Sequence, residues 1–135
     1  MGYQTVLPEG WRRPKGYSNA VVARGRQIYV AGQVGWDSEE RFSSDDLAEQ
    51  AAQALRNVVA VLEAAGAGPE HIVRMTWYVT DKSAYVAGLK EIGQAYREII
   101  GRNFPAMTAV EVTALVEDRA KVEIECTAVV DEGSG

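Results

Sequence analysis

The chain has 135 residues and a formal net charge of −5, and 47% of its residues are hydrophobic and 24% charged. This balance suits a single globular domain (residues 1–135) whose core needs no disulfide or metal, and it excludes a disordered chain. No apolar run approaches the ~18 residues of a membrane span, and the first residues lack the apolar segment of a secretory signal. We therefore expect a cytoplasmic protein that does not enter the membrane.

Cys126 and His71 are the only cysteine and histidine, which excludes an internal disulfide and a two-histidine metal site. A cysteine on the apolar side of a strand is usually a small buried hydrophobe, so a Cys–His nucleophilic pair is disfavoured. Cations and aromatic residues are interleaved in segment 11–17. The acidic net charge nevertheless argues against nucleic acid as a partner.

The N-terminal third of the chain is predicted to form strands. Residues 1–15 contain two prolines and two glycines, and we expect an irregular or edge-strand lead-in. Strand-forming runs at 21–23 and 27–31 flank Arg24-Gly25-Arg26, which predicts a β-hairpin with Gly25 in its turn. At the other end of the chain, residues 131–135 are expected to be a flexible tail.

Two helices follow from the spacing of apolar residues. Ser43 and Asp46 form a capping-box-like pair before a helical stripe that runs to Gly66, a typical C-terminal stop. A second stripe begins near residues 81–83, and Gly101 ends it.

Three further strands are predicted at residues 71–80, 107–115 and 121–130. The order is then β-β-α-β-α-β-β, an α+β sandwich of one mixed sheet with two helices on one face. Apolar residues occupy both faces of strands 27–31 and 71–80. Since two helices cover only one face, we expect a second copy of the chain to cover the other.

Glu123 and Glu125 share the polar face of the last strand, and Glu111 is a weaker candidate of the same kind. Such carboxylates either form a solvated surface or, at an interface between copies, hold a water or a protonated nitrogen. The pattern alone leaves both interpretations open.

Four short segments together resemble the RidA (YjgF) family. K-G-Y-S-N-A at 15–20 and I-Y-V-A-G-Q at 28–33 resemble its early G-x-Y-S-x-A and (V/S)-(A/S)-G-Q segments. N-F-P-A at 103–106 and K-V-E-I-E at 121–125 resemble its F/Y-P-A-R and K-(V/I)-E-I-E segments. The segments occur in order and at matching distances over about residues 5–130.

The resemblance implies a chorismate-mutase-like α+β fold and a homotrimer with ligand pockets at its subunit interfaces. Characterised members hydrolyse reactive enamines and imines to keto acids and ammonia without a cofactor or metal. The resemblance implies that Tyr17 lines the pocket, that the backbone of Gly32 faces the ligand with Gln33 beside it, and that Glu123 positions the water.

The main departure from the family is Met107, which stands where deaminating members carry an arginine that grips the substrate carboxylate. Ala109 replaces a common cysteine, and Gly93 replaces a common asparagine. A hydrogen bond to a charged group contributes about 1.5–3 kcal/mol. At ~1.4 kcal/mol per decade, loss of the arginine weakens carboxylate binding by about ten- to a hundredfold or more.

Two interpretations of the pocket remain. Either the ligand is less acidic or larger and packs against Met107, Trp36 or Trp77, or another cation enters the pocket. The candidate cations are Arg13, Lys15, Arg24 and Arg102. We expect Tyr17 and Glu123 to be catalytic, and the ligand to be bound by Gly32, Gln33, Trp36, Gly93, Met107 and Thr108.

The function expected from this resemblance is that of a divergent enamine/imine deaminase with altered substrate preference. The alternative is a non-catalytic trimer that binds a small molecule. A ribonuclease is disfavoured, because the chain is acidic and has neither a histidine pair nor a cluster of metal-binding carboxylates.

Overall fold

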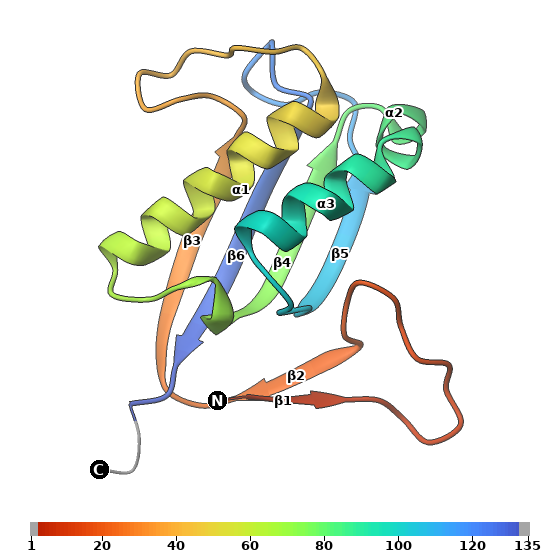
Figure 1. Ribbon diagram of the computed structural model, residues 1–135, viewed down its shortest axis with the longest axis vertical. Helices are drawn as coiled ribbons and strands as arrows, with labels where there is room; N and C mark the ends of the chain where they lie inside the picture. Colours follow the sequence, from red (N-terminus) through yellow and green to blue (C-terminus); the bar gives the residue numbers. More distant parts are fainter. Residues whose placement is uncertain (1–2, 133–135) are drawn as a thin grey trace.

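The computed structural model describes residues 3–132. Its main sheet has four strands in the spatial order β3-β6-β4-β5 (Figure 1). The strands are β3 (Arg26–Val34), β4 (Ile72–Val79), β5 (Ala106–Glu111) and β6 (Val122–Val130). β4 and β5 are parallel, whereas β6 is antiparallel to β3 and β4, so the sheet is mixed as predicted. Of the predicted tail, residues 133–135 lie outside the described residues.

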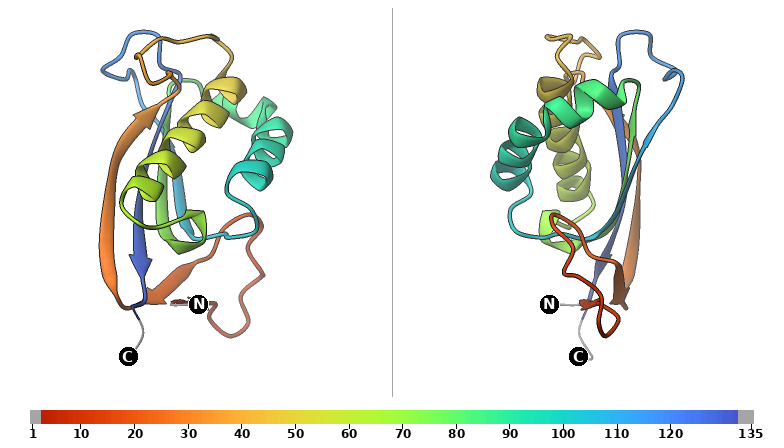
Figure 2. Two further views of the ribbon diagram at one scale, coloured as in Figure 1. Left: turned by 60° about the vertical axis from the view of Figure 1, so that its left-hand side comes forward. Right: turned by 90° about the vertical axis from the view of Figure 1, so that its right-hand side faces the viewer.

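Three α-helices lie on one face of this sheet (Figure 2). They are α1 (Leu47–Ala64), α2 (Lys82–Ala87) and α3 (Leu89–Ile99). The cap of α1 is Asp46, whose side chain accepts the Glu49 backbone N–H at 3.0 Å. The predicted capping box, with Ser43 as the cap and Asp46 three residues into the helix, is wrong by one turn. The predicted second helix is divided at Gly88, a residue of low helix propensity. Within residues 3–132, no helix has the length and apolar character needed to span a membrane.

The core fills the space between helices and sheet. Most of its largest fully buried apolar side chains come from the inner face of α1 and from β4 and β6: Leu55, Val58, Leu62, Ile72, Met75, Val122 and Ile124. Cys126 belongs to this cluster, and burial raises the pKa of its thiol to about 12. It is therefore a core side chain, as predicted, with almost no reactive thiolate at neutral pH.

The N-terminal strands form a small sheet of their own. β1 (Tyr3–Val6) pairs with β2 (Ala20–Ala23), while β3 pairs with β6, so the hairpin predicted across residues 24–26 is wrong. Gly25 makes a corner between β2 and β3 instead. Its φ is +143°, and an added Cβ would lie 2.1 Å from the backbone oxygen of Val130. The chain can turn here only because glycine has no side chain.

In the described part of the chain no helix covers the opposite face of the four-stranded sheet, which we call the open face (Figure 2). Its side chains are mostly polar and half-buried or exposed: Tyr29, Arg74, Thr76, Tyr78, Thr108, Glu125 and Thr127. The prediction that both faces of β4 are apolar is wrong. A register shift between Ile72 and Arg74 lets every buried apolar side chain of β4 face the helices.

Gln50, in the first turn of α1, is a buried polar side chain that joins three parts of the chain. It is 1% exposed. Its Nε2 donates to the backbone oxygens of Ser44 and Arg119 at 2.9 and 3.0 Å, and its Oε1 accepts the Lys121 backbone N–H at 2.7 Å. The loops before α1 and before β6 are thereby held against α1.

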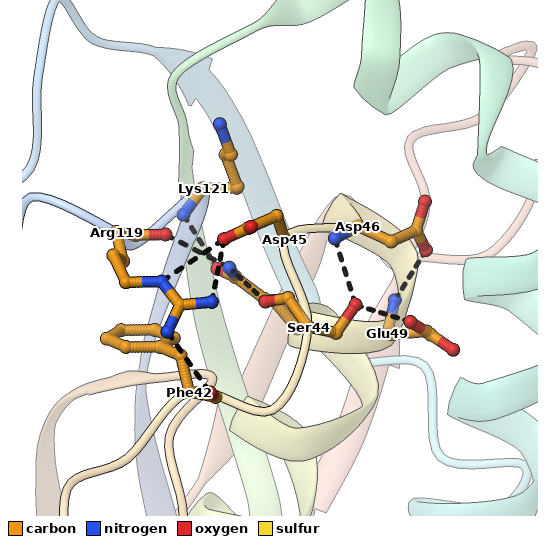
Figure 3. Close-up of polar contacts among 8 residues, drawn as sticks. Phe42, Ser44, Asp45, Asp46, Glu49, Arg119 and Lys121 are labelled. Carbon is orange, nitrogen blue, oxygen red and sulfur yellow. Dashed lines mark hydrogen bonds and ion pairs between the residues drawn. The ribbon is translucent and has the colours of Figure 1, made fainter.

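Arg119 supports the same junction from the solvent side. Its Nη2 donates to Oδ1 of Asp45 at 2.9 Å, and its Nη1 donates to the backbone oxygen of Phe42 at 3.2 Å (Figure 3). Its guanidinium also lies 5.5 Å from the centre of the Phe42 ring. Since this ion pair is exposed, it contributes at most about 1 kcal/mol, and Gln50 supplies the buried part of the junction.

Candidate functional site

A cavity of about 460 Å³, called the β5 cavity below, lies between β5, α3 and the segment that precedes β2. Most of its wall is apolar or aromatic: Trp77, Tyr85, Leu89, Ile92, Phe104 and Met107. Cavities of roughly 300–1,000 Å³ with a mainly apolar lining are typical of small-molecule sites. The β5 cavity is therefore the candidate ligand site.

Tyr17 lines the β5 cavity and is 42% exposed. Ser18, the next residue, fixes this segment: its N–H donates to the Pro105 backbone oxygen at 3.0 Å and its Oγ to the Phe104 backbone oxygen at 2.6 Å. A parallel bridge also joins Ser18 to Ala106. Two of the sequence segments quoted above, far apart in the chain, therefore meet beside the cavity.

Asn103 and Tyr96 support the turn between α3 and β5. Nδ2 of Asn103 donates to the backbone oxygens of Pro69 and Ile72 at 2.8 and 2.9 Å. The Tyr96 hydroxyl donates to the Asn103 backbone oxygen at 2.6 Å, and its ring stacks on Phe104 with centroids 5.8 Å apart. Burial raises the pKa of Tyr96, so this donor stays protonated. The sequence motif contains Asn103, but only these contacts identify it as a support of the cavity.

The wall near β4 and β5 is uncharged. Trp77 is 2% exposed, its Nε1 has no hydrogen-bond partner among the described residues, and Tyr85 packs on it edge to face, with centroids 6.3 Å apart. Met107 is half-buried next to Met75 of the parallel strand β4. The cavity therefore meets a thioether where the resemblance would place a guanidinium.

The charged residues that line the β5 cavity are two cations, Lys15 and Arg97. Neither makes an ion pair or side-chain hydrogen bond within residues 3–132. Lys15 is among the cations considered from the sequence, whereas Arg13, Arg24 and Arg102 do not line the cavity. Arg97 was not predicted from the sequence. The available signal was its position directly after Tyr96, at the border of the apolar stripe of α3.

Glu123 and Gly32 meet on the open face, where β6 lies beside β3. A Cβ at Gly32 would lie 1.9 Å from Oε2 of Glu123, so the carboxylate occupies the space that a side chain would need. Nε2 of Gln33 donates to the backbone oxygen of Ala31 at 3.1 Å. Neither residue lines the β5 cavity, so this group does not belong to the β5 cavity of the same chain.

The other two candidate carboxylates already have partners. Glu125 accepts the Tyr78 hydroxyl at 2.6 Å, and this hydrogen bond raises the pKa of Tyr78, with a smaller contribution from desolvation. Glu111 accepts the Lys82 backbone N–H at 2.7 Å at the start of α2. Glu123 is thus the candidate whose carboxylate has no such partner among the described residues. Within residues 3–132, no three His, Cys, Asp or Glu side chains are grouped as metal ligands would be.

The remaining expected site residues lie in three places. Gly93 lines the β5 cavity from α3. Thr108 is exposed on the open face, next to Thr76. Trp36 packs against Phe42 in the loop before α1, with centroids 5.7 Å apart, and does not line the β5 cavity.

A family model described as Endoribonuclease L-PSP matches residues 12–130 of the chain. Among curated proteins, a human protein named 2-iminobutanoate/2-iminopropanoate deaminase is 35% identical over 114 residues, which cover 84% of this chain and 79% of that protein.

Solved structures are similar over most of the chain. A Yersinia pestis protein of unknown function from the conserved Rid family, YyfB, is 34% identical with a TM-score of 0.86, covering 96% of this chain and all of that one. A Mycobacterium tuberculosis member of the YjgF family is 38% identical with a TM-score of 0.63, covering 85% of this chain and 87% of that one.

Proposed function

This chain belongs to the RidA (YjgF) family, the family of the Endoribonuclease L-PSP model, and from that premise we propose that it is an imine deaminase with an altered substrate preference. One water adds across the C=N bond, its hydroxyl to carbon and its proton to nitrogen. The C–N bond then breaks, so that a carbonyl compound forms and ammonia leaves. No electron is transferred, and proton transfer by positioned side chains is the main catalytic requirement.

In this proposal Glu123 orients the attacking water and accepts its proton, because its carboxylate is free of the hydrogen bonds that engage Glu125 and Glu111. The Tyr17 hydroxyl contacts the substrate in the β5 cavity. The backbone of Gly32 faces the ligand, since no side chain stands between it and the Glu123 carboxylate.

One observation carries the proposal: the candidate residues form two half-sites that lie apart on the same chain. Tyr17, Gly93 and Met107 line the β5 cavity, while Gly32 and Glu123 lie beside β3 on the open face. A second copy that packs its open face against the β5 edge would join them. We therefore propose a homotrimer whose interface pockets combine the half-sites of adjacent copies.

The direct test uses imines generated from amino acids by an amino-acid oxidase. The protein is expected to accelerate imine decay above the rate in buffer, with the imine of alanine among its weaker substrates. No acceleration with any acidic, neutral or aromatic imine contradicts the proposal.

The Met107→Arg variant is expected to raise kcat/KM for 2-iminopropanoate by about ten- to a hundredfold, because a guanidinium at this position can bind the carboxylate with two charge-assisted hydrogen bonds. Met107→Leu is the matched control, since it keeps the wall apolar at similar volume. An unchanged kcat/KM in a folded Met107→Arg protein would show that residue 107 does not set the preference.

The Gly32→Ala variant is expected to lower kcat by about a hundredfold, because its methyl group displaces the Glu123 carboxylate by an ångström or more. The melting temperature should stay nearly constant, because the atoms that the methyl group would meet belong to the flexible end of the Glu123 side chain. The fall in kcat and the constant melting temperature are both checked by measuring rates and melting curves on one preparation. A large fall in melting temperature would mean that the backbone had moved as well.

A non-catalytic small-molecule-binding trimer is the second candidate, favoured by Met107 in the cavity wall. Ligand-induced thermal stabilisation without turnover would support it. RNA cleavage has less support. The single histidine, His71, accepts the Gly68 backbone N–H through Nδ1 at 3.0 Å and lies outside the β5 cavity.

A further inference from the structure

We propose that the β5 cavity selects ligands that join a carboxylate to a large apolar group, with Lys15 and Arg97 binding the carboxylate that Met107 cannot. The inference rests on the proposed function, because it names the class of imino acid that the same cavity would take.

The β5 cavity is positively charged within an acidic protein. The formal net charge of the chain is −5, yet Lys15 and Arg97 line the cavity and no carboxylate does. Neither cation has an ion-pair partner within residues 3–132. Such cations beside a low-dielectric wall attract an anion more strongly than cations in open water. The lining therefore favours an anionic group on the ligand.

Separate elements place the two cations. Lys15 belongs to the segment that Ser18 joins to the residues just before β5, through hydrogen bonds of 3.0 Å to the Pro105 oxygen and 2.6 Å to the Phe104 oxygen. Arg97 follows Tyr96, whose side chain is buried and bonded to the Asn103 backbone oxygen at 2.6 Å. The backbone at both cations is therefore held in place. Arginine can bind a carboxylate through two parallel hydrogen bonds, and lysine adds a mobile point charge.

The other lining residues favour a bulky ligand. Gly93 leaves open space, with nothing within 4 Å of an added Cβ, and Ala109 is small. Met107 is a flexible thioether that adapts to apolar shapes. An aromatic or branched substituent would cover this wall, and the burial of its apolar surface would favour binding. A three-carbon imino acid has too little apolar surface to cover the wall.

The test compares stable probes that differ in one property each. Phenylacetate has both the charge and the ring, phenylacetamide has the ring without the charge, and acetate has the charge without the ring. We expect phenylacetate to bind at least tenfold more tightly than either, as measured by calorimetry. Added salt should weaken phenylacetate binding and leave phenylacetamide binding unchanged.

The variants assign the charge preference to the two cations. In the Lys15→Gln/Arg97→Gln protein, phenylacetate should bind no better than phenylacetamide, and phenylacetamide should bind as in the wild type, which shows that the fold is intact. Arg97→Lys should restore part of the preference. Lys90→Gln is the matched control, because Lys90 lies on α3 outside the cavity lining. The Lys90→Gln protein should prefer phenylacetate over phenylacetamide as strongly as the wild type does.

Three results would overturn the inference: equal affinity for phenylacetate and phenylacetamide, equal affinity for acetate and phenylacetate, or a preference that survives loss of both cations. These results are independent of turnover. Imine hydrolysis without selective phenylacetate binding would refute only the ligand class, and selective binding without hydrolysis would refute only the deaminase activity.

Discussion

The Glu123→Gln variant is expected to hydrolyse imines about a hundred- to ten-thousandfold more slowly than the wild type, the usual range for loss of a general base. Glutamine keeps the size of the side chain but cannot accept the proton of the attacking water. Ligand affinity should change little, since the β5 cavity is built from other residues. Kinetics of imine decay and calorimetry with phenylacetate measure the two effects separately.

Glu117→Gln is the control, because it removes the same charge from an exposed loop residue before β6. It should retain wild-type rates. A Glu123→Gln protein that also retains them would refute the role assigned to Glu123.

A mixture of inactive variants tests whether the half-sites belong to different copies. Tyr17→Phe and Glu123→Gln each remove one half-site, and co-expression gives oligomers of both chains. In random assembly, half of the β5 cavities keep Tyr17 and half of the adjoining open faces keep Glu123, so roughly a quarter of the interfaces are intact. The mixture should regain about that share of wild-type activity. If both half-sites acted within one chain, mixing would restore nothing.

The Gln50→Leu variant is expected to lower the free energy of unfolding by about 2–4 kcal/mol, because leucine leaves the buried Lys121 N–H and two backbone oxygens without their partner. The melting temperature should fall on the order of 10 °C. Urea unfolding followed by circular dichroism measures the change.

Gln94→Leu is the matched control, since Gln94 is exposed on α3 and its replacement should change stability by no more than about 0.5 kcal/mol. Equal stabilities of the Gln50→Leu and wild-type proteins would mean that water replaces all three hydrogen bonds, and that Gln50 does not hold the loops to α1.

Local patterns sufficed for much of the fold. The helical stripe of α1 and the alternation along β6 depend on neighbours within a few residues, so a single sequence reveals them. The cap of α1 was placed one turn too early, because Ser43 and Asp46 both have side chains that suit a cap. The Cys126 environment followed from the same alternation. The hairpin failed because Gly25 signals a turn equally well when the two strands separate into different sheets.

The composition of the open face could not be predicted either. The alternation along β4 was interrupted by a register shift between Ile72 and Arg74, and a shift of one residue moves side chains to the other face. Such a shift depends on pairing with β6, fifty residues away in the chain, and leaves no mark in the local sequence.

By itself, the sequence determined most of the element order, the core stripe of α1, Tyr17 and Glu123 as candidates, and Met107 in place of an arginine, because each is a local pattern or a short motif. Only the tertiary structure decided that Lys15 and Arg97 share a cavity with Met107, that Glu123 lies outside this cavity beside Gly32, and that Gln50 joins two loops to α1. These relations connect residues far apart in the chain. They depend on how strands pair and helices pack, which no short stretch of sequence encodes.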